Sequence, residues 1–225
     1  MTITHCIFDA YGTLFDVAAA ARDAAREPGQ DALAGVWQAL AEDWRRKQLE
    51  YSWLRAITGD HVGFWQVTQD ALDWAMARHG LSEPALRARL LALYWELAAF
   101  PEVPELLTRL KGMGKTCAIL SNGSPDMLEG AVASAGLGDR LDAVISVEEV
   151  RVFKPARAVY DLVGTHFGTD PAQVLFVSSN GWDAAAAAAY GFATAWVNRA
   201  GLPQDRLPGV PTHVLTDLSS IPELL

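Results

Sequence analysis

The sequence contains few of the residues that build disulfide frameworks, zinc sites or nucleic-acid surfaces. Its 225 residues include two cysteines, Cys6 and Cys117. Both fall within predicted strands, where a free cysteine packs as a small apolar side chain. No zinc-ligand spacing is present, so we expect a reducing, cytoplasmic setting. The formal net charge of -9 argues against a nucleic-acid partner. The five histidines lie outside the motifs described below, and none is assigned a catalytic role.

The sequence also lacks the long apolar runs that membrane proteins carry. No basic region precedes the apolar residues at the start of the chain, so a signal peptide is not predicted. The longest weakly polar stretch, residues 184–197, is rich in alanine, interrupted by Gly191 and too short to span a bilayer. The hydrophobic fraction is 51% and the charged fraction 20%, which is ordinary for a soluble globular protein. The length predicts one large domain, or a core with a modest insertion.

The first segment of the chain combines a buried strand with a charged end. Residues 3–8 are mostly apolar and predict a buried strand, and Asp9 follows directly. Gly12 gives the next turn its backbone freedom, and Thr13 offers a hydroxyl. Open α/β sheets place their ligands at the carboxyl ends of strands, which makes Asp9 a candidate functional residue. A role for Asp9 as a simple turn cap remains open at this point.

Residues 17–99 show helical periodicity and no strand signal. Helices are predicted over residues 16–26, 31–57, 64–78 and 83–98. This segment holds six of the eight tryptophans, namely Trp37, Trp44, Trp53, Trp65, Trp74 and Trp95. Core packing accounts for most of them, and one or two are expected to face a cleft. We therefore predict that residues 17–99 form a separate helical cap, or lid, inserted after the first strand.

From residue 100 onward, helical and strand patterns alternate. Strands are predicted over residues 116–120, 143–146, 173–177, 194–197 and 213–215, with helices between them. One such helix opens at Lys154-Pro155 and runs to residue 167. Alternation of this kind implies a parallel sheet with right-handed crossovers. The expected fold class is α/β, with a Rossmann-like, doubly wound core built from residues 1–16 and 100–225.

Polar residues recur at the predicted carboxyl ends of strands and at helix starts. They are Asp9, Thr13, Ser121, Asn122, Lys154, Ser178, Asn180 and Asp183. A doubly wound sheet brings these loops to one edge. Ser124 precedes Pro125 and is predicted to cap a helix, which leaves Ser121 and Asn122 without a visible structural task. Asp183 alone is also explained by the first turn of a helix, where a negative charge is favourable.

Four motifs occur in order along the chain, and together they resemble a known superfamily. They are Asp-x-Tyr-Gly-Thr-Leu from Asp9, Ser-Asn-Gly from Ser121, Lys-Pro from Lys154, and Ser-Ser-Asn-x-Trp-Asp from Ser178. The set resembles the haloacid dehalogenase superfamily and, within it, the L-2-haloacid dehalogenases. Residues 44–51 add an Arg-x-Lys-Gln-Leu-Glu-Tyr pattern similar to a helix of those enzymes. The resemblance covers nearly the whole chain and implies a homodimer that uses no cofactor and no metal.

The same superfamily contains magnesium-dependent phosphatases, and this sequence departs from them at two places. Tyr11 stands where a phosphatase has a second aspartate, and Ser179-Asn180 stands where paired carboxylates would hold magnesium. A hard dication prefers several charged oxygens, so Asp9 with Asp183 alone is a poor magnesium cage. A magnesium phosphatase and a non-enzymatic anion-binding protein on this fold remain the alternatives.

Positive charge in the site must then come from Lys154 and Arg45, which balance the two carboxylates. A small anionic substrate must approach Asp9, and like charges about 4 Å apart repel by roughly 4 kcal/mol in a partly shielded site. Lys154 can offset this repulsion and keep Asp9 ionised. Taken alone, Arg45 also fits a solvated charge on a helix, as we expect for its neighbours Arg46 and Lys47.

The resemblance implies a two-step hydrolysis of short L-2-haloalkanoic acids. Asp9 attacks the halogen-bearing carbon from the rear, so that an ester forms on the enzyme and the carbon inverts to give a D-2-hydroxyacid. Water then attacks the ester carbonyl, with Asp183 as general base.

The remaining roles also follow from the resemblance. The substrate carboxylate would be held by Ser121 and the backbone N–H groups of Ala10 and Tyr11, and the departing halide by Arg45, Asn122 and the edge of Trp182. Orienting and supporting roles fall to Ser178, Asn180, Lys154, Thr13 and Tyr160. Two positions depart from the pattern: Arg46 replaces a frequent glutamine, and Phe153 a frequent tyrosine.

Overall fold

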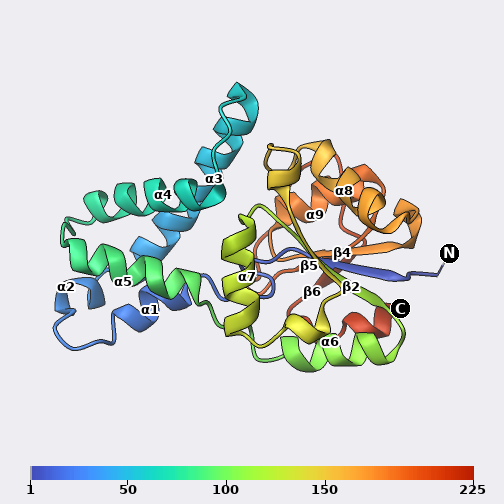
Figure 1. Ribbon diagram of the computed structural model, residues 1–225, viewed down its shortest axis with the longest axis horizontal. Coiled ribbons are helices and arrows are strands. Elements are labelled where there is room, and N and C mark those ends of the chain that lie inside the picture. The colour runs from blue at the N-terminus through green and yellow to red at the C-terminus, as the bar shows by residue number, and fades with distance from the viewer. Residues whose placement is uncertain (1) are drawn as a thin grey trace.

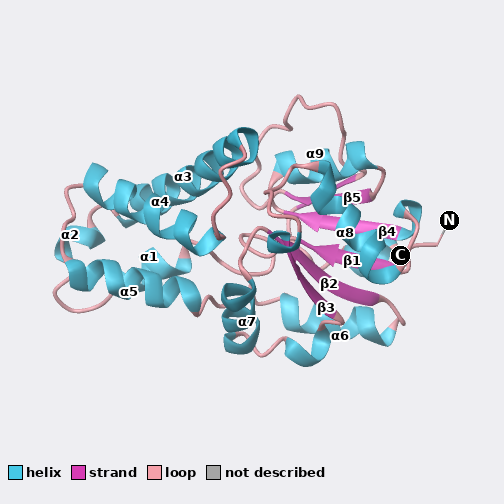
Figure 2. Ribbon diagram, turned by 45° about the horizontal axis from the view of Figure 1, so that its top comes forward, coloured by secondary structure: helices cyan, strands magenta, loops and turns pink. Residues whose placement is uncertain are grey.

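The computed structural model describes residues 2–225 and contains one six-stranded parallel sheet in the order β3-β2-β1-β4-β5-β6. Figure 2 shows β3, β2, β1, β4 and β5 side by side. The strands are β1 (His5–Phe8), β2 (Thr116–Ser121), β3 (Ala143–Ser146), β4 (Val174–Ser178), β5 (Ala193–Val197) and β6 (His213–Leu215). Strand β1 lies between β2 and β4, with Phe8 in register with Ile119 and Val177. The residue that follows β1 therefore lies at the centre of the sheet edge. The predicted doubly wound α/β class is confirmed.

Helices cover both faces of this sheet, as its parallel strands require. Helices α6 (Val103–Gly112) and α7 (Pro125–Ser134) lie on one face, and α8 (Arg157–Phe167) and α9 (Gly181–Tyr190) on the other (Figure 1). Short 3-10 turns, η1 (Gly138–Arg140), η2 (Val147–Glu149), η3 (Pro171–Gln173) and η4 (Ile221–Leu224), complete the connections. We call the sheet with α6 to α9 the core. The two cysteines are free and buried, as predicted, and burial raises the pKa of each thiol to about 12.

Five helices lie together to one side of the core, and we call them the helical segment (Figure 1). They are α1 (Ala19–Ala24), α2 (Asp31–Ala34), α3 (Trp37–Thr58), α4 (Phe64–Arg78) and α5 (Pro84–Trp95). The chain leaves and re-enters the core through two connectors that pair with each other. The Phe100 N–H donates to the Leu14 carbonyl at 2.9 Å, and the Asp16 N–H donates to the Ala98 carbonyl at 3.0 Å. Two backbone hydrogen bonds therefore join the connector that leaves the core to the connector that returns to it.

Three helix predictions were wrong at their boundaries. The single helix predicted over residues 31–57 is broken between Ala34 and Trp37, because Gly35 is a weak helix former and Val36 leaves the helical region at φ -134°. The helix predicted from residue 16 begins at Ala19, since Asp16 belongs to the paired connectors. The helix predicted from Lys154-Pro155 begins at Arg157.

The late start of α8 follows from its preceding residue, Ala156, whose backbone is extended, with ψ 134°.

Within residues 2–225, no helix combines the length and apolar character needed to cross a bilayer.

Candidate active site

A buried lysine joins two carboxylates at the carboxyl edge of the sheet. The Lys154 Nζ donates to Asp9 Oδ1 at 3.1 Å and to Asp183 Oδ2 at 2.9 Å. Asp9 follows β1, Lys154 precedes α8, and Asp183 lies in the first turn of α9. The exposed fractions of the three residues are 6%, 1% and 0% respectively. A buried charge needs such a partner, because leaving it alone is costly.

Burial and neighbouring charges both shift the pKa values of Lys154 and Asp183. Burial lowers the pKa of Lys154, but the nearby charges of Asp183 and Asp9 outweigh it, and the net pKa is raised. Burial also raises the pKa of Asp183, and the charge of Asp9 adds to this effect against the opposing pull of Lys154. Lys154 is therefore protonated throughout the neutral range, while Asp183 holds a proton more readily than an ordinary aspartate.

The second oxygen of Asp9 is held by two further side chains. Thr13 Oγ1 donates to Asp9 Oδ2 at 3.0 Å, and Asn180 Nδ2 donates to the same oxygen at 2.9 Å. Among residues 2–225, no backbone N–H donates to this carboxylate. The alternative reading of Asp9 as a turn cap is thus not what the structure contains. Gly12 adopts φ +88° in the same turn, a conformation that favours glycine.

Asp183 receives a second hydrogen bond from α8. The Tyr160 hydroxyl donates to Asp183 Oδ1 at 2.8 Å. Burial and the charge of Asp183 raise the pKa of Tyr160 far above its usual value. Tyr160 therefore stays protonated and remains a donor. Both oxygens of Asp183 are oriented, and each keeps a lone pair that can accept a proton.

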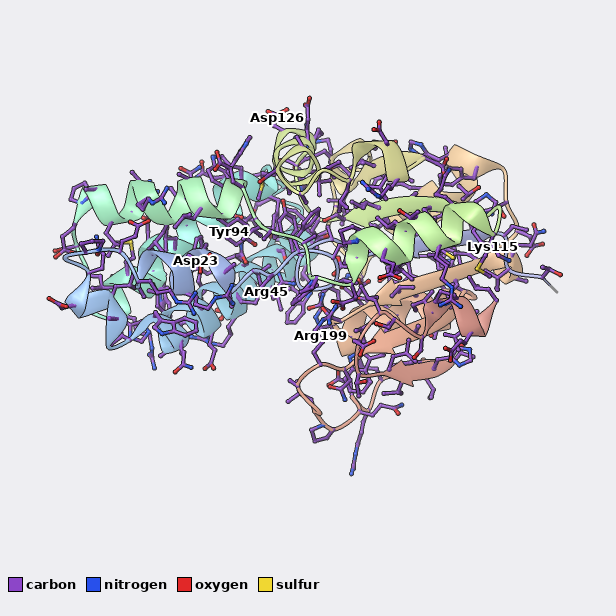
Figure 3. All side chains as sticks on the ribbon, turned by 90° about the horizontal axis from the view of Figure 1, so that it is seen from below. Asp23, Arg45, Tyr94, Lys115, Asp126 and Arg199 are labelled. Atoms are coloured by element: carbon purple, nitrogen blue, oxygen red, sulfur yellow. The ribbon has the colours of Figure 1, made fainter. Side chains whose placement is uncertain are left out.

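Arg45 brings a positive charge from the helical segment to this edge of the sheet. It lies on α3, and its Nη2 donates to Asn180 Oδ1 at 3.2 Å and to the Tyr11 carbonyl at 3.4 Å. Figure 3 shows Arg45 where the helical segment meets the core. A solvated charge would make no such contacts, so this alternative reading of Arg45 does not hold.

The neighbours of Arg45 behave differently from each other. Arg46 is exposed and pairs with Asp43 at 2.7 Å and Glu50 at 3.4 Å, as expected for a surface charge. Lys47 was also predicted to be solvated, but its side chain is only 12% exposed. Its ammonium lies 4.4 Å from the centre of the Trp74 ring. The aromatic face covers the charge, which explains the wrong prediction.

The loop after β2 differs from the prediction, which placed a helix cap at Ser124. Ser124 occupies the position before α7, yet its side chain makes no capping hydrogen bond. Ser121 and Asn122, which were expected to have no structural task, do have one. Ser121 Oγ accepts from the Gly123 N–H at 3.1 Å, and Asn122 Oδ1 accepts from the Lys154 N–H at 2.9 Å. The loop is thus ordered by the side chains of Ser121 and Asn122, and not by a cap at Ser124.

The other predicted site residues lie around this trio at different distances. Ser178 is buried, and its Oγ accepts from the Asn180 N–H at 3.1 Å, which orders the loop after β4. Ala10 and Tyr11 are buried in the turn after Asp9. Trp182 has no hydrogen bond to the trio. Its ring packs edge-on against Trp53 at 5.3 Å, beside a cavity of about 750 Å³ that Tyr160 also lines.

Two residues that support Thr13 were missed. The Ser179 N–H donates to Thr13 Oγ1 at 2.8 Å, and Arg199 Nη2 donates to the Thr13 carbonyl at 3.3 Å. Arg199 also pairs with Glu102 at 2.7 Å. Both residues follow the carboxyl end of a strand, Ser179 after β4 and Arg199 after β5. The same rule that identified Asp9 could therefore have found Arg199.

The donor set does not suit a divalent cation. Within residues 2–225, no group of three or more histidine, cysteine or acidic side chains is placed to hold a metal ion. The two carboxylates at this edge both bind the Lys154 ammonium. The charges of both carboxylates are thus balanced by an ammonium group, whereas a hard dication prefers several charged oxygens.

Comparison with known proteins gives a consistent result. Residues 3–191 match a family model described as haloacid dehalogenase-like hydrolase. The chain is 43% identical over 224 residues to (S)-2-haloacid dehalogenase 1 of Pseudomonas sp. (strain CBS-3), covering 99% of this chain and 96% of the relative. It is 46% identical over 198 residues to the (S)-2-haloacid dehalogenase of Xanthobacter autotrophicus, covering 88% of this chain and 76% of the relative.

Solved structures agree with these relatives. The L-2-haloacid dehalogenase from Xanthobacter autotrophicus with chloropropionic acid covalently bound superposes with a TM-score of 0.87 at 38% identity. That match covers 99% of this chain and 98% of the other. Another L-2-haloacid dehalogenase superposes with a TM-score of 0.93 at 42% identity, covering 100% of this chain and 99% of the other.

Proposed function

Because this chain belongs to the haloacid dehalogenase-like hydrolase family, and its relatives over nearly full length are (S)-2-haloacid dehalogenases, we propose that it hydrolyses short L-2-haloalkanoic acids to D-2-hydroxyacids. The enzyme is thus an (S)-2-haloacid dehalogenase, a hydrolase of carbon–halide bonds. The observation that carries the chemistry is the Lys154 ammonium held between Asp9 and Asp183. It places a positive charge 3.1 Å from the nucleophilic carboxylate, which offsets the repulsion between that carboxylate and an anionic substrate.

The first step is a displacement at the halogen-bearing carbon. An oxygen of Asp9 attacks this carbon from the rear, the carbon–halogen bond breaks, and halide leaves with the bonding electrons. The carbon inverts, and an ester links it to Asp9. Thr13, Asn180 and Lys154 fix the carboxylate in one orientation, which lowers the entropy cost of in-line attack.

Binding groups surround this nucleophile. Ser121 and the backbone N–H groups of Ala10 and Tyr11 hold the substrate carboxylate. Arg45, Asn122 and Trp182 stabilise the charge that grows on the departing halide. The reach of Arg45 to Asn180 and the Tyr11 carbonyl supports its place in this set. Trp182 is supported only by its position next to Asp183.

The second step returns the enzyme to its starting state. Asp183 takes a proton from water, which adds to the ester carbonyl carbon of Asp9. The bond between the Asp9 carbonyl carbon and the ester oxygen then breaks. The product keeps this oxygen, which came from Asp9 in the first step, and takes the proton that Asp183 had accepted. The second proton of the water leaves to solvent, so that Asp9 and Asp183 are carboxylates again. Ser178 and Tyr160 support this step by ordering Asn180 and Asp183.

The division of the chain follows the same proposal. Residues 1–16 and 100–225 form the catalytic core, and residues 17–99 form a lid that delivers Arg45. The paired connectors at Leu14–Asp16 and Ala98–Phe100 support these boundaries. We also propose a cytoplasmic homodimer. The free cysteines support the compartment, and the exposed Leu54 and Ile57 on α3 (52% and 81%) support a partner surface.

The direct test is halide release from each enantiomer of 2-chloropropionate in the presence of a chelator. We expect release from the L form alone, with D-lactate as product. Release from neither form, together with chelator-sensitive turnover of a phosphate ester with magnesium, would favour the phosphatase alternative. Anion binding without any turnover would favour a binding protein.

The ester is tested by one turnover in heavy-oxygen water. Label should enter the Asp9 carboxylate and be absent from the first product, because water attacks the carbonyl of the ester. Label found directly in the product would mean that water attacks the substrate carbon.

A further inference from the structure

One glutamate of the core contacts the helical segment at two points. Glu148 lies in η2, immediately after β3, and faces the turn at residues 59–63 that joins α3 to α4. Its Oε2 bonds with His61 Nε2 at 2.9 Å. Its Oε1 accepts from the Phe64 N–H, the first residue of α4, at 3.3 Å. A single carboxylate therefore joins the middle of this turn and the start of α4 to the core.

Helix α4 needs such an acceptor from outside. The residue before the helix is Gly63, which has no side chain to accept from the free N–H groups of the first turn, and the first turn carries no acidic residue. A carboxylate is the favoured group at a helix N-terminus. Glu148 supplies it across the boundary between core and helical segment, and a Cβ at Gly63 would lie 3.5 Å from the Glu148 Oε1.

His61 ties the same turn to the residue beside the bridging lysine. Its side chain is 9% exposed, and its ring lies 4.9 Å from the Phe153 ring. Its Nδ1 is buried without a hydrogen-bond partner in the described part of the chain, so its bond to Glu148 is the ring's polar anchor. Phe64 lies 6.0 Å from the same Phe153 ring, and Phe153 directly precedes Lys154.

We propose that Glu148 is a positioning residue that docks the helical segment onto the core in the arrangement that catalysis requires. It holds the junction of α3 and α4. Because α3 carries Arg45, the position of this junction sets where Arg45 meets Asn180 and the Tyr11 carbonyl. Docking itself is independent of any substrate, whereas its kinetic consequence rests on the proposed function.

The adjacent residue provides a matched control. Glu149 also pairs with a histidine, His166, at 3.0 Å, but His166 lies on α8, within the core. Removing Glu149 thus deletes a glutamate–histidine pair from the same turn of chain without touching the helical segment.

Docking is measured by the distance between two spin labels, one on each part. Gln66 on α4 and Thr165 on α8 are exposed, and Q66C with T165C provides the labelling sites. The native Cys6 and Cys117 are buried, with the pKa of each raised to about 12, so they react slowly. E148A should broaden and lengthen the distance distribution, and E149A should leave it unchanged. An unchanged distribution in E148A, or an equal change in E149A, would overturn the proposal.

Kinetics provide the second readout on otherwise native protein. A smaller docked population raises the apparent KM by the inverse of that population, so E148A should raise KM for L-2-chloropropionate about tenfold, with kcat within about twofold. E148Q keeps an acceptor for the Phe64 N–H and should recover most of the affinity. H61F keeps the ring packing but loses the hydrogen bond, and adding it to E148A should cost little more. A loss confined to kcat, or fully additive effects, would contradict docking through this pair.

The two proposals fail in distinguishable ways. If no variant, including the native chain, releases halide but E148A alone changes the label distances, the proposed function is wrong and docking by Glu148 stands. If the native chain releases halide from the L form and E148A changes neither distances nor KM, docking is wrong and the function stands.

Discussion

The core and the helical segment contribute to the proposed site in opposite ways. The core supplies Asp9, Lys154 and Asp183 as a buried set, and each charged atom already has a partner from the core. The helical segment supplies Arg45, whose two contacts, at 3.2 and 3.4 Å, are longer than the core bonds. In the proposed mechanism, the core is therefore organised for the covalent step before substrate arrives, whereas the helical segment adds charge stabilisation that depends on its position.

The largest expected effect is in the core. Asp9→Ala should reduce halide release by roughly 10⁶-fold, since no other group can form the ester. Circular dichroism should show a folded protein, because Lys154 keeps Asp183 as a partner. Asp16→Ala is the control: it removes a carboxylate from the same turn region that pairs with Arg22 instead. Residual ester formation in the Asp9 variant, detected by mass spectrometry, would exclude Asp9 as nucleophile.

The next largest effect is expected at Arg45, which the helical segment contributes to the proposed site. Arg45→Lys keeps a charge but loses the planar donors, so kcat should fall roughly 10²-fold, as when one donor to a developing charge is removed. Arg46→Lys next to it should stay within about twofold, since Arg46 is exposed and pairs with surface carboxylates. The measurement is steady-state halide release with chloride and bromide substrates. Equal effects on kcat at the two positions would mean that Arg45 does not stabilise the departing halide.

A smaller effect is expected where the core orients its general base. Tyr160→Phe removes the donor to Asp183 Oδ1 and should lower kcat about tenfold. Asp183 must be ionised to accept a proton, so activity is lost as pH falls through its pKa. Burial already raises this pKa, and loss of the hydroxyl raises it further. The acid limb of the rate profile should therefore move to higher pH, and a limb that stays in place would assign it to another group.

The fold and the identity of the strand-end residues could be predicted from sequence, because both rest on short-range patterns. Alternating strands and helices predict a parallel sheet, and a polar residue directly after a buried strand, as at Asp9, is visible without coordinates. The contacts that cross between distant segments could not be predicted. The pairing of Glu148 with His61, the placement of Arg199 on Thr13 and the covering of Lys47 by Trp74 depend on tertiary packing.

Local rules also failed where packing offered a better partner. Ser124 before Pro125 has the sequence of a helix cap, yet the loop is ordered by Ser121 and by Ser146, whose Oγ donates to the Gly123 carbonyl at 2.7 Å. Helix α4 shows the converse case. It has no local cap in its sequence and receives one from Glu148 in the core.

The smallest expected effect is at Ser124, whose side chain makes no capping hydrogen bond and should therefore contribute little to stability. Ser124→Ala should change the free energy of unfolding by less than about 0.5 kcal/mol, the range of surface substitutions without a specific contact. Asp170→Ala is the comparison, since the Asp170 carboxylate does accept from the Ala172 N–H at 2.9 Å at the start of η3. That change should cost about 1 kcal/mol. Urea unfolding of both variants measures the two values. A cost at Ser124 equal to that at Asp170 would mean that the Ser124 hydroxyl caps α7 in solution, contrary to the structure.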